Sequence, residues 1–324
     1  MSYYLGVDIG GSKSHAIVVS ETGQILGFGK TGAGNHEQVG FDGQAAVLSV
    51  ITDEALAQAG LSRGDIAGAG FGMCGYDWES EKLPHMAAIA TLGLHAPVEL
   101  VNDAMIGLIA GAINGWGICA VAGTSCNAWG RDAHGRQGHA IGMGQMFGEA
   151  GGSSELVYRA RWAMGYAYTK RGAPTRLTET FMQHFGAANE EALIEGFSEE
   201  HYELQAHHAL LIFDVANQGD EVAQSLVRWA GTELGLMSLS VIRQLDMQTA
   251  AFDLVMAGSF YRGSPMIAET LGAQVLPEAP CARLVRLEAS PVLGGALLGM
   301  EVAGCSTEAI EAARQMLISQ PVRD

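Results

Sequence analysis

Short apolar runs separated by glycine-bearing turns open the chain. Residues 3–9 and 15–19 are two such runs, and the turn between them reads Gly10-Gly11-Ser12-Lys13-Ser14. Short β-branched runs that meet at a flexible turn are typical of two adjacent strands. Residues 24–30 predict a third strand, and apolar residues at helical spacing within 43–59 predict a helix after it.

The rest of the first half alternates strands and helices. Apolar runs at 66–73 and 98–101 predict strands, and the patterns at 81–92 and 104–112 predict helices. We therefore expect residues 1–113 to form one α/β unit in the order βββαβαβα.

The second half begins as the first does. Residues 117–122 predict a strand that ends in Gly123-Thr124-Ser125, residues 127–131 predict a second strand, and the glycine-rich residues 138–152 predict a long loop. The head of each half is thus a strand, a turn of glycine and hydroxyl residues and another strand, which is a weak internal repeat. The remaining pattern predicts helices at 153–168, 177–186, 192–197, 203–218 and 221–245, strands at 253–257 and 282–287, and helices starting near 293 and 307.

Length and composition favour two globular domains with a cleft between them. The chain has 324 residues, of which 48% are hydrophobic and 16% charged, so disorder is excluded and each half is long enough to bury a core. We expect a domain at 1–113 and another at 114–324, with the last helix crossing back to the first. The three glycines within 111–117 predict a hinge there.

Charge and cysteine content exclude several classes of partner. The net charge of −17 argues against nucleic-acid and anionic-membrane binding, since both require clustered Lys and Arg. Five cysteines without close pairing indicate reduced thiols, and Cys119 and Cys126 are expected to be buried. The chain starts directly in a strand and has no apolar run of about 18 residues. We expect a soluble, cytoplasmic protein without a membrane partner.

The turn after the first strand has the donors of a phosphate site. Backbone N–H groups around Gly10 and Gly11 and the hydroxyls of Ser12 and Ser14 can donate to phosphate oxygens. Asp8, at the end of the strand, is placed to hold Mg²⁺ through water. The alternative is a plain hairpin with an acidic tip. The second turn, at 123–125, would allow one polyphosphate to be held from both sides.

Four motifs in a fixed order resemble the ATP-binding fold of actin, hexokinase and sugar kinases. They are the turn at 8–14, Asn102-Asp103 after a strand, Gly123-Thr124-Ser125, and Ala257-Gly258-Ser259. The resemblance implies two actin-like (ribonuclease H-like) domains with a central cleft for ATP and substrate.

Further matches place the resemblance in one branch of that superfamily. Asn35-His36, Val101 to Ala104, Gly142 to Gly151 and Pro291 to Ala296 resemble N-acetylglucosamine kinases and the BadF/BadG/BcrA/BcrD-type ATPases. This implies an enzyme that transfers a phosphoryl group from ATP, with Mg²⁺, to N-acetylglucosamine or a close amino sugar, at the 6-hydroxyl. Relatives of this kind are often homodimers.

The resemblance also implies roles for individual residues. Asp103 would be the catalytic base that accepts the proton of the sugar hydroxyl, although an Asp there is also a common helix N-cap. Asp8 would organise Mg²⁺. The implied nucleotide contacts are Gly10, Gly11, Ser12, Lys13, Gly123, Thr124, Ser125, Gly258 and Ser259, and the implied sugar contacts are Asn35, His36, Asp103, Asn127, Gly142, Met143 and Glu149. An ordinary loop pair is the alternative for Asn35 and His36.

The sequence departs from the branch at one loop. Many relatives have Gly-Asp-Glu-Gly where this chain has Gly148-Glu149-Ala150-Gly151, so the carboxylate reaches one methylene farther and the next one is lost. This bears on the identity of the sugar more than on the reaction. Residues 142–144 also lack the aromatic residue of some relatives, and we expect Trp78 and Trp129 to pack in the core.

Two other functions remain open, and a third is disfavoured. A glucosamine or N-acetylmuramic acid kinase would use the same machinery. An ATPase that activates a partner enzyme would need interface cysteines for an iron–sulfur cluster. No cysteine lies in a glycine-rich loop suited to such a bridge, although Cys74, before Gly75, keeps this alternative open. A sugar-responsive repressor would need a DNA-binding segment and a cysteine cluster, and the sequence shows neither.

Overall fold

The computed structural model describes residues 1–320, which form two five-stranded sheets. The first sheet contains β1 (Tyr3–Ile9), β2 (Ser14–Ser20), β3 (Ile25–Thr31), β4 (Ile66–Met73) and β5 (Val98–Asn102). Its order is β3-β2-β1-β4-β5. The first three strands are antiparallel, and β4 and β5 run parallel to β1.

The second sheet repeats this plan. It contains β6 (Gly117–Ala122), β7 (Cys126–Arg131), β8 (Gln137–His139), β9 (Phe252–Ala257) and β10 (Ala282–Arg286). Its order is β10-β9-β6-β7-β8, with β6 to β8 antiparallel and β9 and β10 parallel to β6. The predicted α/β class and internal repeat are therefore confirmed, while β8 lies in a stretch predicted as loop.

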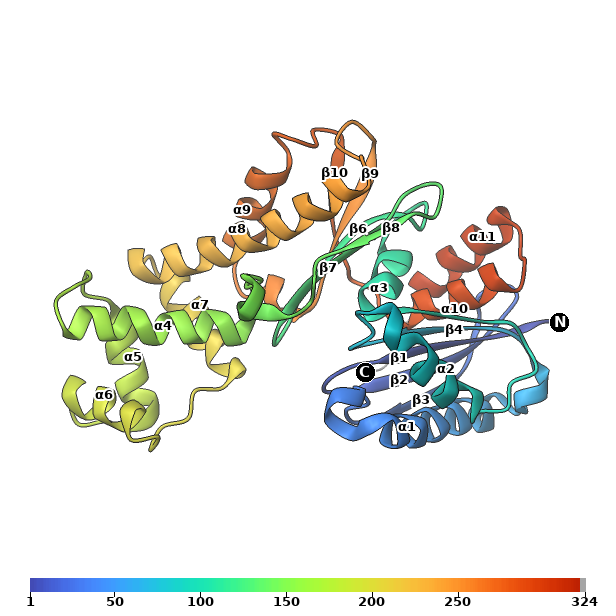
Figure 1. The fold of residues 1–324 in the computed structure, drawn as a ribbon, viewed down its shortest axis with the longest axis horizontal. Coiled ribbons are helices and arrows are strands. Elements are labelled where there is room, and N and C mark those ends of the chain that lie inside the picture. Colours follow the sequence, from blue (N-terminus) through green and yellow to red (C-terminus); the bar gives the residue numbers. More distant parts are fainter. Residues whose placement is uncertain (321–324) are drawn as a thin grey trace.

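Helices cover both faces of the first sheet (Figure 1). On one face α1 (His36–Ala59) and α2 (Lys82–Ala90) pack against β1, β2 and β4. On the other lie α3 (Asp103–Gly111), α10 (Val292–Val302) and α11 (Thr307–Ile318). We call this sheet with its five helices the first lobe and the remainder the second lobe.

Glycines let α10 lie directly on the first sheet. A Cβ on Gly70 would lie 2.3 Å from the Gly295 carbonyl oxygen, and one on Gly68 would lie 2.2 Å from that of Gly299. Such contacts exclude any side chain. Some of the 44 glycines of the chain therefore serve the packing of a helix on a sheet.

Helix α3 joins the two lobes. Its side chains share one core with Cys119 of β6, Trp129 of β7 and Val255 of β9, as well as with α10. A Cβ on Gly111 would lie 2.7 Å from Val255 Cγ1, so the helix lies close to the second sheet. A residue at the start of α3 is therefore held between the lobes.

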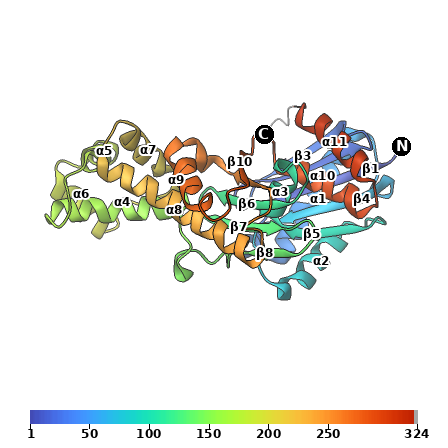
Figure 2. The same cartoon turned by 90° about the horizontal axis from the view of Figure 1, so that it is seen from above.

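The second lobe extends away from the first as a helical region (Figures 1 and 2). Its helices are α4 (Ser153–Tyr168), α5 (Arg176–Phe185), α6 (Glu190–Ser198), α7 (Ala209–Asn217), α8 (Glu221–Gln244) and α9 (Pro265–Val275). Helices α8 and α9 pack on each other, and α8 also packs on β6 and β7. The core of this lobe is continuous from the sheet into α4 to α7.

Four details of the sequence reading were wrong. The helix expected at 203–218 begins only at Ala209, because the His208 ring accepts the Gln205 N–H and closes a separate short turn. Helix α9 was missed, although Ser264-Pro265 is a typical helix start. Helix α1 begins at His36, before a kink at Gly40. Trp78 is 46% exposed, whereas Trp129 is buried as expected.

Cys119 and Cys126 are buried thiols, as predicted. Across residues 1–320, none of the helices combines the length and apolarity that a membrane crossing requires.

Candidate active site

The carboxyl ends of three parallel strands bring the first-lobe residues together. In the sheet register Ile9 lies opposite Met73, and Met73 lies opposite Asn102. The Cys74 N–H also donates to the Ile9 carbonyl. Asp8, the loop after β4 and Asp103 therefore meet at one edge of the first sheet, as expected for an α/β ligand site.

Carboxylates converge on Cys74 at this edge. Burial raises the pKa of the Cys74 thiol far above its usual value, and the negative charges of four carboxylates, Asp103, Asp77, Glu37 and Asp8, raise it further. The thiol is therefore protonated and unreactive at neutral pH. The four carboxylates therefore lie close enough to the thiol for their charges to act on it.

Asp103 is the first residue of α3 and not its cap. The Asn102 side chain is the cap, since its Oδ1 accepts the Ala104 N–H at 2.9 Å. Burial raises the pKa of Asp103 to about 6, although hydrogen bonds from the backbone lower it. An ionised carboxylate with a pKa near neutrality suits a general base. The N-cap alternative for Asp103 is wrong.

Asn35 and His36 lie beneath the same edge. Asn35 is 6% exposed and caps α1, because its Oδ1 accepts the Glu37 N–H, and its Nδ2 donates to the Glu37 carboxylate. The His36 ring stacks on Phe41 at 4.5 Å between centroids. Asn35 and His36 therefore both stabilise the start of α1, one as its cap and the other by stacking on Phe41.

The first turn presents its hydroxyl outward. Gly10 N–H donates to the Lys13 carbonyl at 3.1 Å and closes the turn. Ser12 and Lys13 are exposed, whereas Ser14 is fully buried against Gly34. Of the two serines that the sequence offered as phosphate donors, only Ser12 lies on the surface.

The second turn and the glycine after β9 are neighbours. Val121 lies opposite Ala257 in the register of β6 and β9. A Cβ on Gly258, which has a φ of 106°, would lie 2.1 Å from the Ala122 carbonyl oxygen. Thr124, Ser125 and Ser259 are exposed at this edge. The predicted phosphate and adenosine contacts of the second lobe therefore share one surface.

The loop after β8 is organised by Glu149. This side chain is 8% exposed, and its carboxylate accepts the backbone N–H groups of Ile141 and Met143. It thereby shapes the turn at Gly142, which has a φ of 80°. Met143 is 42% exposed on the same loop.

Asp77 is a site residue that the sequence reading missed. Its Oδ1 accepts hydrogen bonds from Asn102 Nδ2 at 3.1 Å and from Asn127 Nδ2 at 3.5 Å. Burial, followed by the charge of Asp103, raises its pKa to about 7. The sequence signal was a carboxylate four residues after a buried strand, whereas Asp103 follows the next strand directly.

The site suits a cation held mainly by water and phosphate. No group of three or more His, Cys, Asp or Glu side chains within residues 1–320 forms a ready-made metal cage. The acidic cluster around Cys74 nevertheless offers carboxylate oxygens, which Mg²⁺ prefers, and Mg²⁺ commonly keeps several waters. The residues present therefore fit Mg²⁺.

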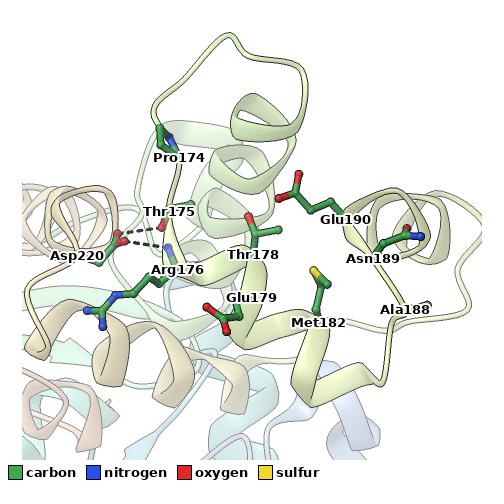
Figure 3. A pocket seen from close by; sticks show the side chains of 10 residues that line it. All are labelled: Pro174, Thr175, Arg176, Thr178, Glu179, Met182, Ala188, Asn189, Glu190 and Asp220. Carbon is green, nitrogen blue, oxygen red and sulfur yellow. Dashed lines mark hydrogen bonds between the residues drawn. The ribbon is translucent and has the colours of Figure 1, made fainter.

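A separate hollow of about 590 Å³ lies among α5, α6 and the start of α8 (Figure 3). Its main polar group is Asp220, which accepts hydrogen bonds from Thr175 Oγ1, Arg176 N–H and Ala223 N–H. These bonds join α5 to α8 and cap the latter. None of the predicted site residues lines this hollow.

Two lobes of one topology, with glycine-and-hydroxyl turns and a carboxylate on the helix between them, define the actin-like class of nucleotide-binding proteins. The chain belongs to the BadF/BadG/BcrA/BcrD ATPase family, whose model matches residues 5–299. The resemblance inferred from the sequence is thus confirmed, and ATP is the nucleotide for which the family is named.

The chain is also similar to named kinases. It is 25% identical to an N-acetyl-D-glucosamine kinase of Dictyostelium discoideum over 92% of this chain and 97% of that protein. It is 26% identical to an N-acetylmuramic acid/N-acetylglucosamine kinase of Clostridium acetobutylicum over 80% and 85%. A solved structure of a Chromobacterium violaceum protein assigned as an N-acetylglucosamine kinase has a TM-score of 0.66 at 22% identity, covering 92% and 99%. The structural likeness supports the fold.

Proposed function

We propose that this chain is an ATP-dependent kinase that phosphorylates N-acetylglucosamine or a close amino sugar at the 6-hydroxyl. The observation that carries the proposal is Asp103, a carboxylate whose pKa burial raises to about 6, at the start of the helix between the lobes. The names of the two curated relatives support the substrate class.

Asp103 supplies the proton acceptor for the transfer. The hydroxyl oxygen of the sugar attacks the γ-phosphorus of ATP, its proton passes to the Asp103 carboxylate, and the bond from the γ-phosphorus to the bridging oxygen breaks. The products are a sugar phosphate, ADP and a proton on Asp103 that is then lost to water. Positioning and charge stabilisation contribute most to such a reaction.

Glycine and hydroxyl turns hold the nucleotide. Ser12 and Lys13 with Gly10 and Gly11 contact the phosphates from the first lobe, and Thr124 and Ser125 with Gly123 contact them from the second, while Gly258 and Ser259 lie against the adenosine. Exposure of both turns supports these roles. When bound, Mg²⁺ neutralises the phosphate charge, and Asp8 is the residue proposed to hold it, through water.

The sugar contacts come from both lobes. We assign Asn35 and His36 of the first lobe and Asn127, Gly142, Met143 and Glu149 of the second. Glu149 acts chiefly through the loop that its carboxylate organises. At Glu149 this chain has the longer Glu where many relatives have Asp. The sugars to be tested therefore include an acetylated amino sugar with a further substituent, such as N-acetylmuramic acid.

We assign the first domain to 1–113 and the second to the residues from 114 onward, with α10 and α11 packed back on the first sheet. Sugar binding closes the lobes about the segment 111–117, which keeps water from the phosphoryl group. A homodimer is the proposed assembly. Small-angle scattering with and without sugar tests closure, and an unchanged radius would reject it.

A coupled assay of ADP release tests the function. The panel contains glucosamine, N-acetylglucosamine, N-acetylmannosamine, N-acetylmuramic acid and glucose, with a reaction lacking sugar as the control. We expect sugar-dependent ADP release with the acetylated amino sugars, and NMR of the product should show phosphate on the 6-oxygen. ATP hydrolysis that no sugar accelerates would reject the kinase and favour an ATPase that acts on a partner.

A further inference from the structure

We propose that Asp77 is a positioning residue that holds Asn102 of the first lobe and Asn127 of the second lobe in register, so that the sugar site assembles over Asp103. This inference rests on the proposed kinase function. It assigns a role to a residue that lies in neither phosphate turn.

On the first-lobe side, Asp77 is tied to the helix that carries the base. Asn102 Nδ2 donates to Asp77 Oδ1 and to the Tyr76 carbonyl, both at 3.1 Å. The other end of the same amide caps α3 through Ala104 N–H. One asparagine thus connects the Asp77 loop to the first turn of α3, where Asp103 lies.

The Asp77 loop is itself held in place. The Glu81 carboxylate accepts the backbone N–H groups of Asp77 and Trp78, both at 2.9 Å. A carboxylate on a loop anchored in this way can fix the orientation of its partners, since its own freedom has already been lost.

On the second-lobe side, Asp77 reaches two sugar-site residues. Asn127 Nδ2 lies 3.5 Å from Asp77 Oδ1, at the long limit of a hydrogen bond. A Cβ on Gly142 would lie 3.1 Å from both Asp77 Oδ1 and Asn127 Nδ2. Asp77 therefore touches the strand and the loop that carry the proposed sugar contacts.

The charged groups around Asp77 are acidic. Asp103 at the start of α3, Glu81 of its own loop and Glu37 of α1 all raise the pKa of Asp77, after burial, while the hydrogen bond from Asn127 lowers it. The amide groups of Asn102 and Asn127 are thus the favourable partners that offset this repulsion, which is consistent with a carboxylate kept for positioning.

Two substitutions separate positioning from charge. In Asp77→Ala the acceptor is lost, and we expect the KM for the sugar to rise about 10-fold and kcat to fall about 10-fold, with the KM for ATP unchanged. In Asp77→Asn the amide oxygen still accepts both hydrogen bonds, so we expect recovery to within about threefold of wild type. Glu79→Gln, an exposed change on the same loop, is the matched control and should have no effect.

A measurement without sugar separates this inference from the kinase assignment. In a double-mutant cycle of melting temperatures, Asp77→Ala and Asn127→Ala should give less than the sum of their separate shifts, because each removes the same bond. Additive shifts would overturn the proposed register, as would a wild-type KM for sugar in Asp77→Ala or an equal defect in Asp77→Asn. If the wild type phosphorylates no sugar, the proposed kinase function is rejected. The double-mutant cycle of melting temperatures then still tests the hydrogen bond between Asp77 and Asn127.

Discussion

The two sheets share one strand order, yet their carboxyl edges differ in chemistry. The edge of the first sheet carries Asp8, Asp77 and Asp103, whose charges all raise the pKa of the Cys74 thiol. The same edge of the second sheet ends in glycine and hydroxyl residues, at Gly123-Thr124-Ser125 and Gly258-Ser259. A repeated topology therefore carries two different surfaces.

The difference separates two tasks of a phosphoryl transfer. Neutral donors and close-approach glycines can accept a polyanion without charge repulsion. Carboxylates repel the same polyanion unless a cation lies between them, but they alone can take a proton. We infer that the second edge serves the nucleotide, whereas the first edge, besides its own phosphate turn at residues 10–13, serves the cation and the acceptor hydroxyl.

The largest effect is expected from a substitution at the carboxyl edge of the first sheet, which we call the acidic edge because it carries Asp8, Asp77 and Asp103. Asp103→Asn keeps the shape of the side chain but removes the proton acceptor, so we expect turnover to fall by about two to four orders of magnitude. Binding of nucleotide and sugar, measured by calorimetry, should stay near wild type because the contacts remain. Full activity would remove Asp103 from the role of base.

The next largest effect is expected from a substitution at the carboxyl edge of the second sheet, which we call the neutral edge because its glycine and hydroxyl residues carry no charge. Gly258→Ala places a Cβ 2.1 Å from the Ala122 carbonyl oxygen at a φ of 106°, so the backbone of this edge must shift. We expect the KM for ATP to rise about 10- to 100-fold, with little change in the KM for sugar. Gly165→Ala, within α4, is the matched control, since nothing lies within 4 Å of its Cβ position and it belongs to neither turn. Equal behaviour of the two variants would contradict this account.

The acidic edge also predicts a pH dependence. With a pKa of about 6 for Asp103, kcat/KM should fall about tenfold per unit as the pH drops below 6, because the base becomes protonated. Asp103→Asn should abolish this limb in its residual activity. An acid limb centred near pH 4 would indicate that Asp103 is not the titrating group.

The raised pKa of Asp103 also predicts that its ionised carboxylate lowers the free energy of unfolding. The folded pKa of Asp103 lies above the unfolded value of 3.8, so its protonated form stabilises the fold below about pH 4, and this stability is lost as the pH rises through about 6. Asp103→Asn should therefore increase the free energy of unfolding by about 1–2 kcal/mol at pH 8 and by much less at pH 4. Denaturant titrations at the two pH values measure this difference.

The sequence analysis named candidate residues on both carboxyl edges, but it missed the contact between the lobes through Asp77. Glycine-and-hydroxyl turns and a carboxylate after a strand are local patterns, so Gly123, Gly258 and Asp103 could be selected directly. Asp77 was missed because its role depends on Asn102 and Asn127, which lie 25 and 50 positions away. The close packing of α10 on the first sheet could not be predicted for the same reason, since a contact between a helix and a sheet leaves no local signal.

The smallest effect is expected from a substitution of Glu149, in the loop where this chain departs from its relatives. The Glu149 carboxylate accepts the N–H groups of Ile141 and Met143, and Asp, shorter by one methylene, cannot reach both without moving the loop. In Glu149→Asp we expect the KM for sugar to rise about three- to tenfold while the KM for ATP stays unchanged. Glu155→Asp shortens a different buried carboxylate, which accepts the Gly152 N–H at the start of α4, and separates a local effect from general loosening. If Glu149→Asp instead improves sugar binding, the carboxylate contacts the sugar directly and does not act through the loop.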